Sequence, residues 1–331
     1  MTADTFLERV RVGSTDLTVT RLGLGTAALG GWPQAVSVDQ AVSTIRRAWD
    51  RGVRYFDTAP FYGHGNSESN LGWALGKTPR EEFTLSSKVG IALDEGPAPT
   101  ALYQGAAPFT PRFDFSAAAI RRSLDESRSR LGFPQIDIAF IHDPDDHHDQ
   151  ASREAYPLLR GLRDAGVLKA IGVGMNSSSA LARFAEEADF DCFLVAGRYT
   201  LLEQHSLDDL LPIAQARGMS IMVGGSLNSG LLVSPGQDSF YNYAPAPQDV
   251  IDRAQRIESV CTSFEVPLRA AALQFPLAHP AVTALLAGAR TPQEVDDTFD
   301  MFEAPIPDEL WQRLKEQELL RADAPTPRAG T

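Results

Sequence analysis

The sequence alternates regularly between short apolar runs rich in β-forming residues and longer stretches with helical periodicity. We expect strands at residues 21–25, 55–57, 83–88, 136–142, 170–173, 192–196, 220–223 and 282–287. Helical patterns lie at 38–51, 67–75, 116–131, 151–165, 177–188, 207–217 and 249–264. Strands that alternate with helices form parallel βαβ units, and eight such units can close into a barrel. The sequence therefore predicts an α/β fold, a (β/α)8 TIM barrel.

The rival architecture is an open doubly wound sheet that binds a dinucleotide. That fold has a G-x-G-x-x-G turn after its first strand, and neither Gly23–Gly25 nor Gly30–Gly31 gives this pattern at the right offset. We therefore favour the barrel, as a single domain over residues 1–331.

Additional segments surround the predicted barrel. Residues 10–12 and 17–19 predict an N-terminal β-hairpin, because residues 13–16 between them suit a turn. Long loops follow strand three, at 91–115, and strand seven, at 224–248. Loops of this length are usually functional or disordered, and both would lie over the C-terminal mouth of the barrel. An extra helix near 308–320 precedes a polar tail, residues 322–331, that we expect to be mobile.

Composition excludes several classes of function. The net charge of −13 argues against nucleic-acid binding, which needs a basic surface. Hydrophobic content of 43% with 22% charged residues is typical of an enzyme with a sizeable core. Two cysteines are too few for a disulfide framework. No apolar run approaches a membrane span, and the N-terminus lacks a signal-peptide pattern. We expect a cytoplasmic protein, a monomer or small homo-oligomer, that acts on a small molecule.

Four chemically active residues lie at or just beyond predicted strand ends: Asp57, Tyr62, Lys88 and His142. In a barrel of this kind, such positions converge on the C-terminal mouth. A tyrosine can exchange protons near neutral pH if its pKa falls below about 10, and a nearby ammonium lowers it. We therefore expect Lys88, held by Asp57, to lower the pKa of Tyr62, and His142 to hydrogen-bond the reacting oxygen.

Histidines 147 and 148 follow in the segment HDPDDHHD and raise the question of a metal site. No further ligands stand at a telling spacing, so we expect no metal.

The four residues, in this chain order and at these strand ends, resemble the catalytic tetrad of the aldo-keto reductase superfamily. The resemblance extends from the opening hairpin and GLGTAALGG to GARTPQEVDDT. It implies a nicotinamide cofactor bound across the barrel mouth. The cofactor-binding residues that the resemblance implies are Thr26, Ala27, Asp57, Asn176, Ser226, Leu227, Ser229, Gly288, Ala289, Arg290, Glu294 and Thr298. The expected substrate contacts are Trp32, Phe61, Tyr62, His142, Asp143, Arg198 and the aromatic residues of 91–115.

Two positions depart from the family pattern. Many members have Ser-Asn directly after the fifth strand, whereas Gly174 and Met175 here precede Asn176. Many members also stack a tyrosine on the nicotinamide, at a position that is Gly224 or Gly225 here.

The adenosine end of the cofactor site suggests which nucleotide binds. NADPH-dependent members commonly carry arginine at the position of Glu294. A carboxylate would repel a 2′-phosphate and accept a hydrogen bond from a 2′-hydroxyl. Arg290 is the opposing feature, because it could reach a phosphate. We predict NAD as the cofactor, with NADP as the alternative.

The segments FDFSAAAIRRSLDESRSRLG and LVAGRYTLL resemble a branch that contains D-threo-aldose (L-fucose) 1-dehydrogenases and pyridoxal 4-dehydrogenase. This resemblance implies NAD-dependent oxidation of a cyclic hemiacetal to its lactone, with Tyr62 as general acid or base. One alternative is an NADPH-dependent reductase of aldehydes or ketones. Another is a regulatory nucleotide-binding barrel resembling the β subunits of potassium channels.

Overall fold

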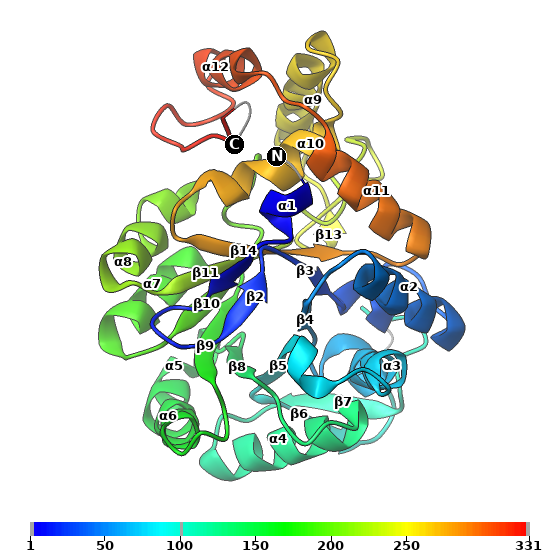
Figure 1. The fold of residues 1–331 in the computed structure, drawn as a ribbon, viewed down its shortest axis with the longest axis vertical. Coiled ribbons are helices and arrows are strands. Elements are labelled where there is room, and N and C mark those ends of the chain that lie inside the picture. The colour runs from blue at the N-terminus through cyan, green and yellow to red at the C-terminus, as the bar shows by residue number, and fades with distance from the viewer. Residues whose placement is uncertain (1–2, 100–101, 329–331) are drawn as a thin grey trace.

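A closed barrel of eight parallel strands forms the centre of the molecule (Figure 1). The computed structural model describes residues 3–99 and 102–328. The barrel strands are β3 (Leu22–Gly25), β4 (Tyr55–Asp57), β5 (Thr84–Val89), β8 (Ile138–His142), β9 (Ala170–Met175), β10 (Cys192–Ala196), β11 (Ser220–Gly224) and β14 (Val282–Gly288). They pair in chain order, and β14 closes onto β3. All eight predicted strands and the predicted barrel are confirmed.

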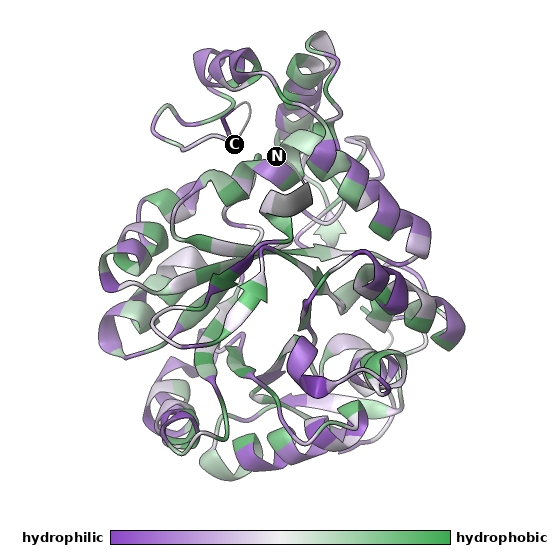
Figure 2. Cartoon of the chain, in the orientation of Figure 1, coloured by the Kyte–Doolittle hydropathy of each residue, from purple (hydrophilic) through white to green (hydrophobic). Residues whose placement is uncertain are grey.

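Helices surround the barrel and show alternating hydrophobic and hydrophilic bands (Figure 2). The main ones are α2 (Val38–Asp50), α3 (Asn66–Leu75), α4 (Ala117–Leu131), α6 (Tyr156–Asp164), α7 (Ser178–Glu187), α8 (Leu210–Arg217), α9 (Gln248–Ser263), α10 (Leu268–Gln274), α11 (Pro292–Glu303) and α12 (Asp308–Glu316). The helix predicted at 151–165 begins with a π-helical turn before α6. Helices α10 and α11 were not predicted from the sequence; α10 directly follows Pro267, and α11 begins at Pro292.

Side-chain caps fix where several of these helices begin. Ser37, Ser116 and Ser177 accept hydrogen bonds from backbone N–H groups in the first turns of α2, α4 and α7. Such caps satisfy donors that a helix start leaves without partners, and each stabilises the fold by about 1 kcal/mol. In these three βα units, the local sequence therefore determines where the helix begins.

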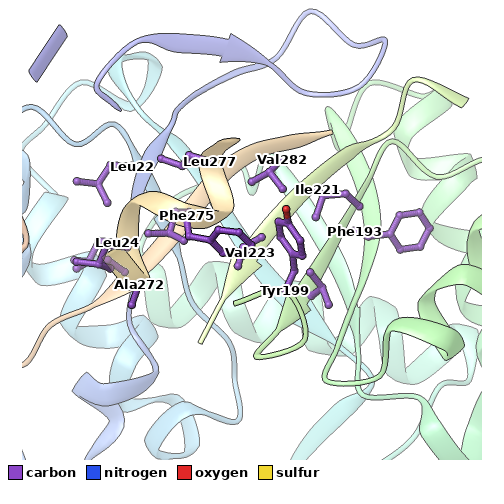
Figure 3. Close-up of a cluster of buried hydrophobic side chains, with 14 of the residues drawn as sticks. Leu22, Leu24, Phe193, Tyr199, Ile221, Val223, Ala272, Phe275, Leu277 and Val282 are labelled. Carbon is purple, nitrogen blue, oxygen red and sulfur yellow. The ribbon is translucent and has the colours of Figure 1, made fainter. Parts of the chain in front are cut away.

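Two apolar cores hold the layers together. One fills the barrel interior with inward side chains such as Tyr55, Phe140 and Leu286. The other lies between the barrel and the helices; Figure 3 shows a part of it that includes Ile221 and Phe275. Neighbouring strands pack tightly at some of the glycines. A Cβ on Gly172, for example, would come within 2.3 Å of the Cys192 carbonyl oxygen.

The predicted N-terminal hairpin is present as β1 (Arg9–Arg11) and β2 (Thr18–Thr20). Its residues Val12, Leu17 and Val19 belong to the core inside the barrel. The hairpin therefore closes the N-terminal end, and the C-terminal end remains as the mouth.

Both predicted long loops contain structure of their own. The loop after β5 includes an antiparallel hairpin of β6 (Ile91–Glu95) and β7 (Phe109–Phe113). The loop after β11 carries a smaller hairpin of β12 (Phe240–Tyr241) and β13 (Ala244–Pro245).

The first residues of the tail that we expect to be mobile contact the end of α12. Ala324 is buried, and the Lys315 ammonium donates hydrogen bonds to the carbonyl oxygens of Ala322 and Ala324. The lysine thus ties the chain back onto the end of α12. Residues 329–331 lie outside the described part.

Within residues 3–99 and 102–328, none of the helices has both the length and the apolar character needed to span a bilayer.

Candidate active site

A buried ion pair lies at the C-terminal ends of β4 and β5. The Lys88 ammonium donates a 2.6 Å hydrogen bond to Asp57 Oδ2 and a second one, of 3.0 Å, to the carbonyl oxygen of Thr58. The two charged side chains are only 1% and 4% exposed. A Cβ at Gly174 would stand 3.8 Å from Lys88 Cε, so this glycine lies beside the lysine stem.

Ser86, which was not predicted as a site residue, completes the support of Asp57. Its hydroxyl donates a 2.6 Å hydrogen bond to Asp57 Oδ1 and lies 3.2 Å from the hydroxyl of Tyr55. Both carboxylate oxygens of Asp57 are therefore engaged. The signal was present in the sequence, since Ser86 lies two residues before Lys88 and so shares its face of the strand.

Tyr62 and His142 stand next to this ion pair. Tyr62 begins a short 3-10 segment after β4, and Lys88 Nζ lies 4.8 Å from the centre of its ring. His142 is the last residue of β8, and its ring meets that of Tyr62 at 90° with centroids 5.9 Å apart. The fold thus brings together Asp57, Tyr62, Lys88 and His142, as predicted.

The proton chemistry of the site differs from the prediction in one respect. Burial raises the pKa of Tyr62 well above 10, and the Asp57 carboxylate raises it further. The expectation of a lowered Tyr62 pKa is therefore contradicted for the protein alone, and the physical reason is the burial of the phenol beside the Asp57 carboxylate.

Burial lowers the pKa of His142 well below its usual value, and the nearby Lys88 charge lowers it further. The imidazole is therefore neutral at physiological pH. A neutral imidazole can hydrogen-bond a reacting oxygen without adding a charge.

Aromatic side chains surround these four residues. Phe61 lies 6.2 Å from the His142 ring and 5.5 Å from Tyr103, measured between ring centroids. Trp32 contacts Tyr243 edge to face at 4.9 Å. Tyr103 comes from the long loop after β5, whose aromatic residues were expected here. Tyr243 comes from the loop after β11 and was not predicted.

Asp143 and Arg198, the remaining predicted substrate contacts, have different surroundings. Asp143 directly follows His142, and its Oδ2 lies 3.7 Å from His142 Nε2. The Arg198 guanidinium is already bonded to the carbonyl oxygen of Asn176, at 2.8 Å, to Glu203, and to the Asn242 side chain. Arg198 thus fastens the β11 loop to the end of β9.

The residues expected near a nicotinamide surround the same mouth. The Thr26 hydroxyl donates to the carbonyl oxygen of Asp57, and Ala27 begins the turn that follows. Strand β9 runs to Met175, two residues beyond its predicted end. Asn176 therefore follows the strand directly, and the two residues that separated it from the expected strand end belong to the strand itself.

The turn after β11 has the character of an anion site. Asn228 and Ser229 have positive φ angles of 46° and 59°. In the described chain, the backbone N–H groups of Ser226, Leu227 and Ser229 have no acceptor within the protein. Successive free N–H groups in a tight turn form a concave donor set that suits phosphate oxygens. These residues therefore fit the pyrophosphate of a dinucleotide.

The residues expected to contact adenosine form a network at the start of α11. The Arg290 backbone N–H donates a 2.8 Å hydrogen bond to Glu294 Oε2, and its guanidinium lies 3.4 Å from Glu294 Oε1. Thr291 caps the helix by accepting from the Glu294 N–H. The Thr298 hydroxyl donates a hydrogen bond to the Glu294 carbonyl oxygen. Gly288 and Ala289 lead into this network from β14.

The two histidines of HDPDDHHD have aromatic neighbours. His147 stacks on Phe113 at 5.7 Å, and His148 lies 4.4 Å from the Phe184 ring centroid. Over the described ranges, no three His, Cys, Asp or Glu side chains are placed to share a metal ion.

Comparisons with known proteins agree with this geometry. The sequence model of the Aldo/keto reductase family matches residues 21–318. Pyridoxal 4-dehydrogenase of Microbacterium luteolum is 40% identical, over 95% of this chain and 98% of that protein. D-threo-aldose 1-dehydrogenase of a Pseudomonas species is also 40% identical, over 94% and 96%. An aldo-keto reductase of Bacillus halodurans, solved in its holo form, superposes with a TM-score of 0.77 at 24% identity and covers 96% of this chain and 97% of its own.

Proposed function

Because the chain belongs to the aldo/keto reductase family, whose members are NAD(P)-dependent oxidoreductases, we propose that it oxidises a cyclic hemiacetal to its lactone. The observation that carries this proposal is the buried Lys88–Asp57 pair of 2.6 Å beneath Tyr62 and His142. The choice of a hemiacetal is supported by the two relatives at 40% identity, which are named as aldose and pyridoxal dehydrogenases. Both aldoses and pyridoxal form cyclic hemiacetals.

The proposed roles follow from where each side chain stands. Tyr62, in its phenolate form, accepts the proton of the anomeric hydroxyl, while the hydride on the same carbon leaves and a C=O bond forms. His142, neutral and beside Tyr62, hydrogen-bonds the reacting oxygen and fixes its orientation. Asp57 and Ser86 hold the Lys88 charge under the Tyr62 ring. When bound, the nicotinamide supplies the hydride acceptor.

We propose NAD as the preferred cofactor, held through the free N–H groups of the β11 turn and the start of α11. The Arg290 guanidinium lies beside the Glu294 carboxylate, so its charge is largely balanced before a nucleotide arrives. A 2′-phosphate would add negative charge to this pair, while a 2′-hydroxyl could donate a hydrogen bond to Glu294.

The test is a substrate panel with each cofactor. The purified protein is mixed with NAD or NADP and with L-fucose, D-arabinose, L-galactose, pyridoxal or a plain aliphatic alcohol, and reduced-nicotinamide fluorescence is followed. Turnover of a sugar or of pyridoxal with NAD supports the proposal. Silence across this panel, with activity only when NADPH and aldehydes are supplied, would refute it in favour of a reductase.

Tyr62→Phe is the matched variant, because it removes one hydroxyl and keeps the ring. We expect it to bind cofactor nearly as wild type, measured by fluorescence titration, and to lose at least about 100-fold in kcat. A variant that keeps near-normal kcat would remove Tyr62 from its proposed role.

A further inference from the structure

The residue after His142 has an unusual backbone. Asp143 has a φ of 45°, in the left-handed region that residues other than glycine seldom adopt. Its N–H donates a 3.0 Å hydrogen bond to the carbonyl oxygen of Gly174, at the end of the neighbouring strand. Aspartate is among the residues that tolerate this conformation. Positions held in such a conformation cluster at functional sites, and this one lies directly beside His142.

The carboxylate of Asp143 receives no hydrogen bond from any donor in the described residues. His142 Nε2 lies 3.7 Å from Asp143 Oδ2, and that imidazole is neutral. Arg198, the cation among the predicted substrate contacts, is bonded to Asn176, Glu203 and Asn242. The side chain is 41% exposed. An acceptor of two or more hydrogen bonds therefore stands open beside the catalytic residues.

The charge of Asp143 acts on the space that a substrate would enter. Burial raises the pKa of Tyr62, Tyr103 and Tyr243, and the Asp143 carboxylate raises each of them further. The carboxylate thus lies within electrostatic reach of the reacting phenol and of one tyrosine from each long loop. This carboxylate would gain from donors that a ligand brings.

We propose that Asp143 is a specificity-determining residue that accepts hydrogen bonds from ring hydroxyls adjacent to the reacting carbon, so that the substrate class is an aldose in its cyclic form. This inference rests on the proposed hemiacetal oxidation. A sugar brings several O–H donors to the acceptor that the protein leaves open, while a hemiacetal without other hydroxyls brings none. A site built to hydrogen-bond a substrate hydroxyl rejects analogues that lack it, because its own polar group then stays without a partner.

The experiment compares two substrates that share the reacting group. L-Fucose carries a hemiacetal and ring hydroxyls, and tetrahydropyran-2-ol carries the hemiacetal alone. Asp143→Asn keeps the shape of the side chain and tolerates a positive φ, but it removes the charge and one acceptor oxygen. Asp145→Asn is the control, because it removes the same charge from an exposed residue two positions away.

For Asp143→Asn we expect kcat/KM to fall about 10- to 100-fold on L-fucose, the range for a hydrogen bond to a charged group, and to change less than about threefold on tetrahydropyran-2-ol. Asp145→Asn should stay within about threefold of wild type on both substrates. If the role of Asp143 were only structural, Asp143→Asn would instead lower kcat/KM on both substrates by a similar factor.

The outcomes separate this inference from the proposed function. An equal loss on both substrates, or no loss on either, would overturn the role of Asp143 and leave hemiacetal oxidation standing. Oxidation of pyridoxal without oxidation of any aldose would overturn the aldose assignment alone. A wild-type protein that oxidises no hemiacetal with either cofactor would overturn both.

Discussion

The ion pair between Lys88 and Asp57 permits a quantitative prediction about stability. Lys88→Met removes the ammonium and leaves the Asp57 carboxylate buried, with the Ser86 hydroxyl as its remaining hydrogen-bond donor. Breaking a buried pair in this way costs about 3–5 kcal/mol, because one charge stays desolvated without its partner. An unfolding entropy of about 2.1 cal/mol/K per residue amounts to about 0.7 kcal/mol/K for this chain of 331 residues. We therefore expect Lys88→Met to lower Tm by about 4–7 °C.

The same pair predicts strong non-additivity. Asp57→Asn leaves the ammonium bonded to the Thr58 carbonyl oxygen, and the double variant Asp57→Asn/Lys88→Met removes both buried charges. We expect the double variant to be more stable than the sum of the single losses by at least about 2 kcal/mol.

The assay is thermal and urea unfolding at pH 7, followed by circular dichroism, for the wild type, both single variants and the double variant. Lys169→Met is the control, because Lys169 is 49% exposed and its bridge to Asp137 should be worth less than about 1 kcal/mol. Additive losses, or a Lys88→Met variant as stable as the control, would refute the reasoning that the pair is desolvated and coupled.

Two further predictions concern pH and cofactor choice. Because burial raises the pKa of Tyr62, the fraction of phenolate in the protein increases as pH rises toward and beyond 10, and we expect kcat/KM for oxidation to climb with pH without a plateau below about pH 9. A plateau already reached at pH 8 in initial-rate measurements would contradict this. Glu294→Arg should improve kcat/KM with NADP relative to NAD by at least about tenfold, because it replaces a negative charge near Arg290 with a positive one. An unchanged ratio would mean that the adenosine contacts lie elsewhere.

The part of the site that lies on strands could be predicted from the sequence. Parallel strands end at one edge of the barrel, so Asp57, Lys88 and His142 had to converge once the strands were identified. The length of β9 shows the limit of this reasoning. Its last residues are Gly174 and Met175. The strand was predicted to end before Gly174, because glycine weakens a strand. Here the glycine lies inside the strand, beside the Lys88 stem.

The electrostatics could not be predicted in the same way. The identity of Tyr62 and Lys88 indicated a lowered pKa, but the outcome depends on which acceptors the ammonium reaches and how deeply the phenol is buried. The adenosine end shows the same dependence. Arg290 and Glu294 were weighed as opposing features, whereas the fold joins them in one hydrogen-bonded pair at the start of a helix. A spacing of four residues indicates such a pair only where a helix is expected, and α11 was not predicted.

The loops at the mouth add a different kind of dependence. Tyr103 and Tyr243 come from segments whose positions are set by contacts with other loops, such as the edge-to-face contact of Tyr243 with Trp32. The turn that carries Tyr243 has positive φ angles at Asn242 and Tyr243. The contact with Trp32 and the hydrogen bond from Arg198 to Asn242 hold this turn in place. Asp143, in contrast, is fixed by β8 and by its bond to the end of β9. If Asp143 selects for ring hydroxyls, as we propose, the fixed strand end would supply the requirement for a sugar. The tyrosine walls from the two loops would then decide which sugar fits, because loops vary more between related proteins than the barrel that carries them.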